Sequence, residues 1–175
     1  MTNNNDDIEV DVDATYRIEL KGKTTPEYTI SQQISAWLQE NLEGLTDDHN
    51  HKLFSRVNTG YNEETLKTFG KQPVCDVYIN NIEYSDTFEV TQPDKVNTIV
   101  LFYLKGASNK SYMDACALHD YIMQEFITND DFKQLDGIVS NTRIQNSELR
   151  IQPIRKKWGV IGAFELSHWI IQRWD

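Results

Sequence analysis

Two aspartates and two histidines stand together in one polar stretch, and side chains of these types bind transition metals. Asp47, Asp48, His49 and His51 supply carboxylate and imidazole groups, which are common zinc ligands. Two histidines separated by one residue cannot both face one metal from a helix, although a loop would allow it. No third or fourth ligand follows at a supporting spacing. We therefore interpret the stretch as a solvated polar loop and expect no bound metal.

The other two histidines are predicted to be packing residues. His119 falls within the broad apolar face of a predicted helix, and His168 stands between Leu166 and Ile170 on a predicted strand. A satisfied, partly buried imidazole is expected at both positions rather than a general base. The sequence contains no Gly-rich phosphate loop, zincin motif, nucleophile elbow or Cys–His arrangement. It therefore nominates no catalytic residue, and no cofactor is expected.

The 175 residues, of which 39% are apolar, indicate a single globular domain. A formal net charge of -10 argues against nonspecific binding to nucleic acid or to an anionic membrane, because their phosphates repel the chain. Cys75 and Cys116 lie in apolar patterns, so both are predicted to be reduced core residues. No apolar run reaches transmembrane length and the N-terminus lacks signal-peptide character. A soluble intracellular protein is expected.

The best-defined unit of the sequence is a strand followed by a helix. Residues Val96–Leu104 are apolar, aromatic or β-branched at both sets of alternating positions, which predicts a central strand covered on both faces. Ser111 and Asp114 are interpreted as a capping box that opens a helix ending near Ile127. An apolar stripe at helical spacing consists of Ala115, Leu118, Ile122 and Phe126. Three neighbouring residues widen it: Cys116, Met123 and Ile127. The residues expected to be nearly fully buried are Phe102, Leu118, Ile122 and Phe126.

The first 24 residues form an acidic extension ahead of a domain of residues 25–175. Ile8, Val10 and Val12 alternate with acidic residues, and a period of two predicts a strand with one buried face. Such a strand at the edge of a domain can pair with its own sheet or with a neighbour's. The alternative is a half-ordered tail. The extension is therefore interpreted as an arm or an extra strand.

A second helix is predicted next, and a long connection follows it. Thr29 and Gln32 form another capping box, and an apolar stripe continues from them to Gly44, which supplies a stop. The stretch Leu45–Gln72 shows no clean period beyond a short helix around Glu63–Phe69. A connection of this length in a compact domain is usually functional or mobile.

Strands make up most of the remainder. The predicted strands are Pro73–Ile79, Tyr84–Thr91, Ile138–Ile144, Leu149–Ile154 and Val160–Trp174. Asn80–Asn81 is interpreted as the turn between the first two, and Asn129–Asp131 as a helix stop or the cap of a short turn. Pro153 marks an edge strand or a bulge. The order predicts an α+β fold, a mainly antiparallel sheet packed against two amphipathic helices.

This layout resembles the tail terminator proteins of long-tailed bacteriophages, a family also described as tail-to-head joining or minor tail proteins. Two segments carry the resemblance: VNTIVLFYLKG…SYMDACALHDYIMQEF, from Val96 to Phe126, and GVIGAFELSHWIIQRW, from Gly159 to Trp174. The resemblance covers roughly residues Thr25–Trp174 and rests on the order and texture of the elements. The N-terminal extension departs from the family pattern, in which the first helix starts close to the N-terminus.

The resemblance implies a ring, typically a hexamer, on the last ring of the tail tube, where it stops polymerisation and presents a surface for the head connector. It implies no catalysis and no cofactor. The implied partners are other copies of the chain, the tail tube protein and a head-completion or connector protein, with no membrane. DNA would pass through the lumen without specific binding. The implied location is the tail or neck of the virion, after assembly in the host cytoplasm.

A ring built by head-to-tail contacts needs two different complementary patches on each subunit. Because acidic surfaces repel each other across a contact, the contact cores are expected to be apolar or aromatic. We expect the patches in the Leu45–Gln72 stretch and in the terminal hairpin that bears tryptophans. The candidate interface residues are Tyr61, Leu66, Phe69, Trp158, Trp169 and Trp174.

Two other classes of protein stay open on the sequence. An acidic DNA mimic that inhibits a DNA-binding protein would need Asp and Glu clustered on one face. An unrecognised small enzyme would need a deep pocket that holds ionisable groups with perturbed pKa values.

Overall fold

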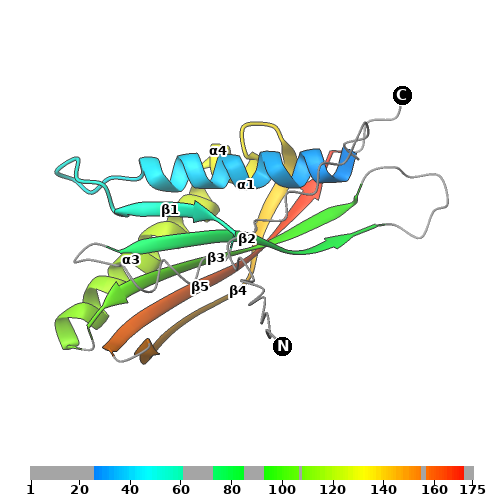
Figure 1. Ribbon diagram of the computed structural model, residues 1–175. Coiled ribbons are helices and arrows are strands. Elements are labelled where there is room, and N and C mark those ends of the chain that lie inside the picture. The colour runs from blue at the N-terminus through cyan, green and yellow to red at the C-terminus, as the bar shows by residue number, and fades with distance from the viewer. Residues whose placement is uncertain (1–25, 61–72, 85–92, 107, 155–156, 172–175) are drawn as a thin grey trace, which may run out of the picture.

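The computed structural model of the protein describes residues 26–60, 73–84, 93–106, 108–154 and 157–171. Its elements are α1 (Pro26–Gly44), β1 (Arg56–Thr59), β2 (Val74–Glu83), β3 (Lys95–Lys105), α3 (Asn109–Thr128), α4 (Asp130–Gln134), β4 (Val139–Ile154) and β5 (Lys157–Ile170). The strands form one twisted sheet in the order β1-β2-β3-β5-β4 (Figure 1). β1 runs parallel to β2, and all other neighbours are antiparallel. The predicted α+β class is confirmed.

The three helices of the described residues lie on one face of the sheet, and the main core fills the space between the two layers (Figure 1). β3 is the central strand, as predicted, and α3 packs over it. The four residues expected to be nearly fully buried are all buried, which confirms that prediction: Phe102, Leu118, Ile122 and Phe126. In the described chain no helix covers the other face, where a smaller cluster surrounds Val74 and Tyr103. Asn97 and Tyr103 of β3 are buried on that face, so the strand has buried side chains on both faces.

Helix α3 begins earlier than its predicted capping box. Ser108 is the N-cap, and its hydroxyl accepts a hydrogen bond from the backbone N–H of Ser111 at 3.1 Å. Ser111 is thus inside the first turn, and Asp114 is exposed without a capping role. The box was misplaced because serine occurs at both positions, and only the backbone conformation tells which one caps. At the other end of the helix, Ile127 is exposed and does not widen the buried stripe.

Helix α1 also begins before its predicted box, at Pro26. Proline suits the first helical turn because it has no N–H to leave unpaired. Thr29 and Gln32 therefore lie within the helix, and the box interpretation was wrong. The predicted stripe is correct, since Ile34, Leu38 and Leu42 are buried. Gly44 ends the helix, as predicted.

Strand β1 was not predicted, and the turn at Asn80–Asn81 was predicted where none exists. β1 has only four residues, one of them buried, so the alternation of apolar and polar residues is too short to predict a strand. β2 continues through Asn80–Asn81, where a bulge shifts its register against β3. Bulges insert a residue without ending a strand. Several predictions fall outside the described residues: the N-terminal extension, the short helix around Glu63–Phe69 and most of the strand Tyr84–Thr91.

The last two strands form one long hairpin, in which β4 is an edge strand of the sheet. The two predicted strands Ile138–Ile144 and Leu149–Ile154 are one strand with bulges near Asn141 and Asn146. Pro153 lies on this edge strand, as predicted. The predicted helix stop is correct too, because Asn129 ends α3 and its side chain caps α4.

Candidate functional site

Trp158 lies at the free end of the β4–β5 hairpin and is 57% exposed. Its register partner is Pro153, which is also exposed, and two residues away on β4 Ile151 is 44% exposed. All three side chains are on the helix-facing side of the sheet, since Ile151 pairs with buried Val160. We call this surface of Ile151, Pro153 and Trp158 the hairpin tip. Exposed aromatic and aliphatic side chains that lie together make the hairpin tip a candidate interaction surface.

Trp169 lies near the other end of β5, on the face that bears no helix in the described chain. Its ring contacts two cations, with the Lys95 ammonium 5.9 Å and the Arg143 guanidinium carbon 5.3 Å from the ring centroid. Lys95 in turn pairs with Glu83 at 2.7 Å. Trp169 is partly buried and already held by these cation–π contacts.

Trp158 and Trp169 therefore do not share one surface, although both lie on the terminal hairpin. Trp158 and Trp169 are eleven residues apart on one strand, about 36 Å at the usual rise. Strand alternation places their side chains on opposite faces because eleven is odd. Four candidate residues lie outside the described residues: Tyr61, Leu66, Phe69 and Trp174. Trp158 is thus the candidate that the structure leaves most available.

The sequence analysis missed a groove at the opposite edge of the sheet, between α1 and β2. It encloses about 830 Å³. Its walls, which we call the edge groove, include Ser31, Ser35 and Ala36 of α1, Gly60, and Ile79 and Ile82 of β2. The groove exists because four-residue β1 covers only the first part of ten-residue β2. Since β1 itself was not predictable, no sequence signal indicated the groove.

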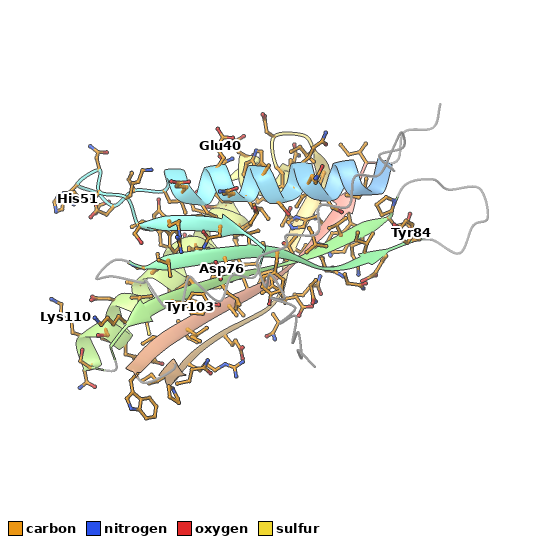
Figure 2. All side chains as sticks on the ribbon, in the orientation of Figure 1. Glu40, His51, Asp76, Tyr84, Tyr103 and Lys110 are labelled. Carbon is orange, nitrogen blue, oxygen red and sulfur yellow. The ribbon has the colours of Figure 1, made fainter. Side chains whose placement is uncertain are left out.

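The Asp47–His51 stretch is an exposed loop, as predicted, beyond the end of α1 (Figure 2). The Asp47 carboxylate accepts hydrogen bonds from the backbone N–H groups of His51 at 2.9 Å and His49 at 2.8 Å. The N–H of His51 is the main cause that lowers the pKa of Asp47. This carboxylate therefore organises the loop. In the part of the chain that the structure describes, no three His, Cys, Asp or Glu side chains are placed to hold a metal.

We expect removal of metal ions to leave the protein unchanged, because the Asp47 carboxylate is already used within the loop. Thermal unfolding with and without EDTA should give the same melting temperature, and elemental analysis should find no stoichiometric zinc. The variant His49→Gln/His51→Gln serves as a control and should melt like the wild type. Stoichiometric transition metal that this variant loses would overturn the expectation.

His168 is a core residue, as predicted, and it joins the three strands on the helix-facing side. Its Nε2 lies 2.8 Å from the Thr98 hydroxyl of β3, and its Nδ1 lies 2.9 Å from the Thr142 hydroxyl of β4. A neutral imidazole has one donor and one acceptor, and each hydroxyl can satisfy either. Burial lowers the pKa of His168 to about 3. The imidazole is therefore neutral in the folded protein at ordinary pH.

His168 should make the protein less stable in mild acid. The unfolded chain binds a proton below pH 6.5 and the folded chain only near pH 3, so the free energy of unfolding falls as the pH drops between these values. At pH 5 the loss relative to pH 7.5 should be about 2 kcal/mol. Urea unfolding at both pH values measures it. His168→Gln should remove this part of the pH dependence, whereas His49→Gln, on the exposed loop, should retain it. An equal slope in His168→Gln and wild type would contradict the assignment.

His119 was predicted to have all its hydrogen-bonding groups paired, and the structure differs from this prediction. Its ring stacks on Phe164 at 4.5 Å between centroids, between α3 and the sheet. Its Nε2 is buried and has no hydrogen-bond partner among the described residues. The ring is therefore held mainly by stacking, and its Nδ1 lies 3.6 Å from the carboxylate of exposed Asp120.

A polar network crosses the helix-free face near Trp169. The Asn97 amide donates to Glu83 at 2.6 Å, and the Ser167 hydroxyl donates to Asn97 at 2.5 Å. The hydrogen bond from Lys95 is the main cause that lowers the pKa of Glu83. The network links β2, β3 and β5. It gives hydrogen-bond partners to polar groups that would otherwise be buried without one. It is a structural feature of the sheet, which also explains why Asn97 and Ser167 are buried.

No protein-family model matches the chain, and a search of curated proteins finds no match. Within the described residues, no helix is both long enough and apolar enough to cross a lipid bilayer. Both cysteines are free, as predicted. Cys75 belongs to the core, whereas Cys116 is only partly buried and lies outside the core cluster, so its prediction as a core residue was wrong.

Proposed function

We propose that the protein is a structural protein of a long-tailed phage. In this proposal it forms a ring, hexameric as in the family it resembles, that caps the tail tube. The ring ends tube polymerisation, offers a surface to the head connector and lets DNA pass through its lumen. It needs no cofactor and performs no reaction.

The observation that carries the proposal is the exposed apolar hairpin tip. A monomer gains no stability from a tryptophan that is 57% exposed beside a half-exposed isoleucine, whereas an interface buries both. The tip lies on one edge of the sheet and the edge groove on the other. Two different surfaces on one subunit are what a head-to-tail ring requires. The order of helix, strands, helix and terminal hairpin also agrees with the order on which the family resemblance rests.

The rival classes have less support in the described chain. A DNA mimic needs its carboxylates on one face, whereas exposed Glu40 and Asp130 lie on the helix side of the sheet and exposed Glu148, which pairs with Ala163, lies on the opposite side.

An enzyme needs a pocket with perturbed ionisable groups. Cys75 and His168, whose pKa values are shifted, are buried in the core and line neither large hollow. Asp47 and Tyr121, whose pKa values are also shifted, do line the hollow near the Asp47 loop. The Asp47 carboxylate is already held by backbone N–H groups, and the side chain of Tyr121 is exposed.

The test of the proposal is deletion of the gene from the phage that carries it. We expect tails of uncontrolled length that fail to join heads, because nothing then stops the tube or presents the connector surface. Electron microscopy of lysates measures tail length and head attachment, and expression of the wild-type chain from a plasmid should restore both. Normal-length tails joined to heads in the deletion would refute the function.

A further inference from the structure

We propose that the hairpin tip of one copy docks into the edge groove of the next copy, where strand β4 adds to the uncovered part of β2. This inference rests on the proposed ring and assigns its subunit contact. It joins two surfaces that the described part of a single chain leaves unused.

The groove has the form of a missing strand. β1 pairs with β2 only as far as Val77, and the N–H of Gly60 donates to the Val77 carbonyl at 2.6 Å where this pairing ends. Gly60 has a positive φ of 85°, which ends the extended run. Beyond it, no strand of the described chain pairs with β2 on the side away from β3. As far as the described residues go, the place beside Ile79–Glu83, beneath α1, is therefore open to an added strand.

Ser31 independently indicates that something binds there. Its side chain lines the groove and the residue is only 6% exposed, yet its hydroxyl has no hydrogen-bond partner among the described residues. A buried hydroxyl without a partner destabilises a fold. A strand laid in the groove would bring backbone N–H and C=O groups to this hydroxyl. The groove thus gains a hydrogen bond as well as apolar contact when it is filled.

The chemistry of the tip matches that of the groove. The tip presents an isoleucine, a proline and a tryptophan, and the groove has no charged residue among those that line it. In a chain of net charge -10, most other pairings of surface would bring like charges together. A second copy can therefore dock here without carboxylates meeting at the centre of the contact. Trp and aliphatic residues in a desolvated pocket are the usual centres of binding energy.

The geometry allows the sheet to continue from one copy into the next. β2 and β5 run in one direction and β3 and β4 in the other, because each neighbouring pair is antiparallel. β4 of one copy would therefore pair with β2 of the next in antiparallel fashion. The side chain of Ile151 is on the helix-facing side, as are those of Ile79 and Ile82, which pair with buried Thr98 and Val96. Ile151 would thus enter beneath α1 and add to its apolar contacts.

The two surfaces also lie at opposite ends of the strands. In Figure 2, Tyr84 marks the groove end of β2, and Lys110, at the start of α3, lies at the other end of the molecule. The hairpin tip is at the α3 end, since the Gly106 N–H before that helix donates to the Trp158 carbonyl at 3.0 Å. Successive copies would be displaced along the strands, as tilted strands in closed rings are. The contact is therefore head-to-tail and not two-fold.

Cross-linking of the full chain tests the contact directly. Ser35→Cys places a thiol in the groove and Ile151→Cys places one at the tip, in a background in which Cys116→Ser removes the partly buried native thiol. A short bis-maleimide should convert the double variant into a ladder of covalent oligomers. A mixture of the two single variants should stop at dimers, since each chain then has one reactive surface. The control pairs Ser35→Cys with Ile127→Cys, whose side chain is exposed to the same 57% as Trp158 but lies near the end of α3.

Association of unlabelled protein gives a second measurement, by sedimentation over a concentration series up to about 1 mM. Trp158→Ala should lower the association constant at least about thirty-fold, as loss of an interface centre does. Ala36→Trp should do the same by filling the groove. Ile127→Ala and Glu40→Trp, on exposed positions outside both surfaces, should associate like the wild type.

The outcomes separate this contact from the ring itself. A ladder in the double variant supports both, whereas dimers as its only product would show that the tip and the groove exchange between two copies, which refutes the head-to-tail ring. Rings that form equally well with Trp158→Ala and Ala36→Trp would keep the ring and overturn this contact. No cross-link above the Ile127→Cys control, or a wild type that stays monomeric throughout the series, would also overturn it.

Discussion

Gly162→Ala is expected to lower the free energy of unfolding by about 3 kcal/mol, the upper part of the range for overpacked cores. Gly162 lies on β5 opposite Phe102 of β3. A methyl group at this position would overlap the ring of Phe102. The ring has little room to move, because it is fully buried and packs against Phe54 and Phe164, at centroid distances of 6.5 and 6.3 Å. One added carbon must therefore displace the centre of the core.

Urea unfolding and thermal melting measure this effect, and the melting temperature should fall by about 10 °C for a chain of this size. Gly44→Ala is the matched control. A methyl group there meets nothing within 4 Å and the residue belongs to α1, so this variant should be neutral or slightly stabilising. A Gly162→Ala protein as stable as Gly44→Ala would show that β5 does not pack against Phe102 as described.

Ile122→Ala and Leu118→Ala are expected to destabilise the protein by about 2–5 kcal/mol each, through lost transfer free energy and the cavity left behind. Ile122 is fully buried between α3 and the sheet, so its loss should fall in the upper half of this range. Leu118 is 8% exposed and borders a hollow of about 650 Å³ near the Asp47 loop. The cavity left by Leu118→Ala would open to solvent, so this variant should lose less free energy of unfolding than Ile122→Ala.

Ile127→Ala on the same helix is the control for this series. Its side chain is exposed, so truncation should change the free energy of unfolding by no more than about 0.5 kcal/mol. Denaturant unfolding of the three variants under one condition gives the comparison. Losses below about 1 kcal/mol at both Leu118 and Ile122 would place α3 on the surface and contradict the fold.

Local chemistry determined the elements that are long and strongly periodic. The stripe Ala115–Phe126 identified α3, and the apolar run Val96–Leu104 identified the central strand, because each pattern extends over several turns or pleats. Asn129 indicated the break between α3 and α4 because its amide side chain caps the next turn. The buried His168 was also predictable from its apolar strand neighbours.

Short elements and exact ends depended on contacts that the sequence does not show. β1 is a strand because its four residues pair with Val74–Val77, and nothing in those four residues demands it. Ser108 caps α3 in place of Ser111 because Ser108 has the extended backbone conformation of an N-cap residue. Asn80–Asn81 forms a bulge and not a turn because β3 continues alongside to pair with both halves of β2.

The candidate interface shows the same division. The sequence by itself determined that the chain is acidic, that it has no catalytic motif and that tryptophans lie near its C-terminal hairpin. Only the tertiary structure decided that Trp158 is open while Trp169 is held between Lys95 and Arg143. It alone revealed the groove beside Ser31, since a groove arises where one strand is shorter than its neighbour. The type of a residue determines which contacts its side chain can make. The pairing of strands that are far apart in the sequence determines which of these contacts form.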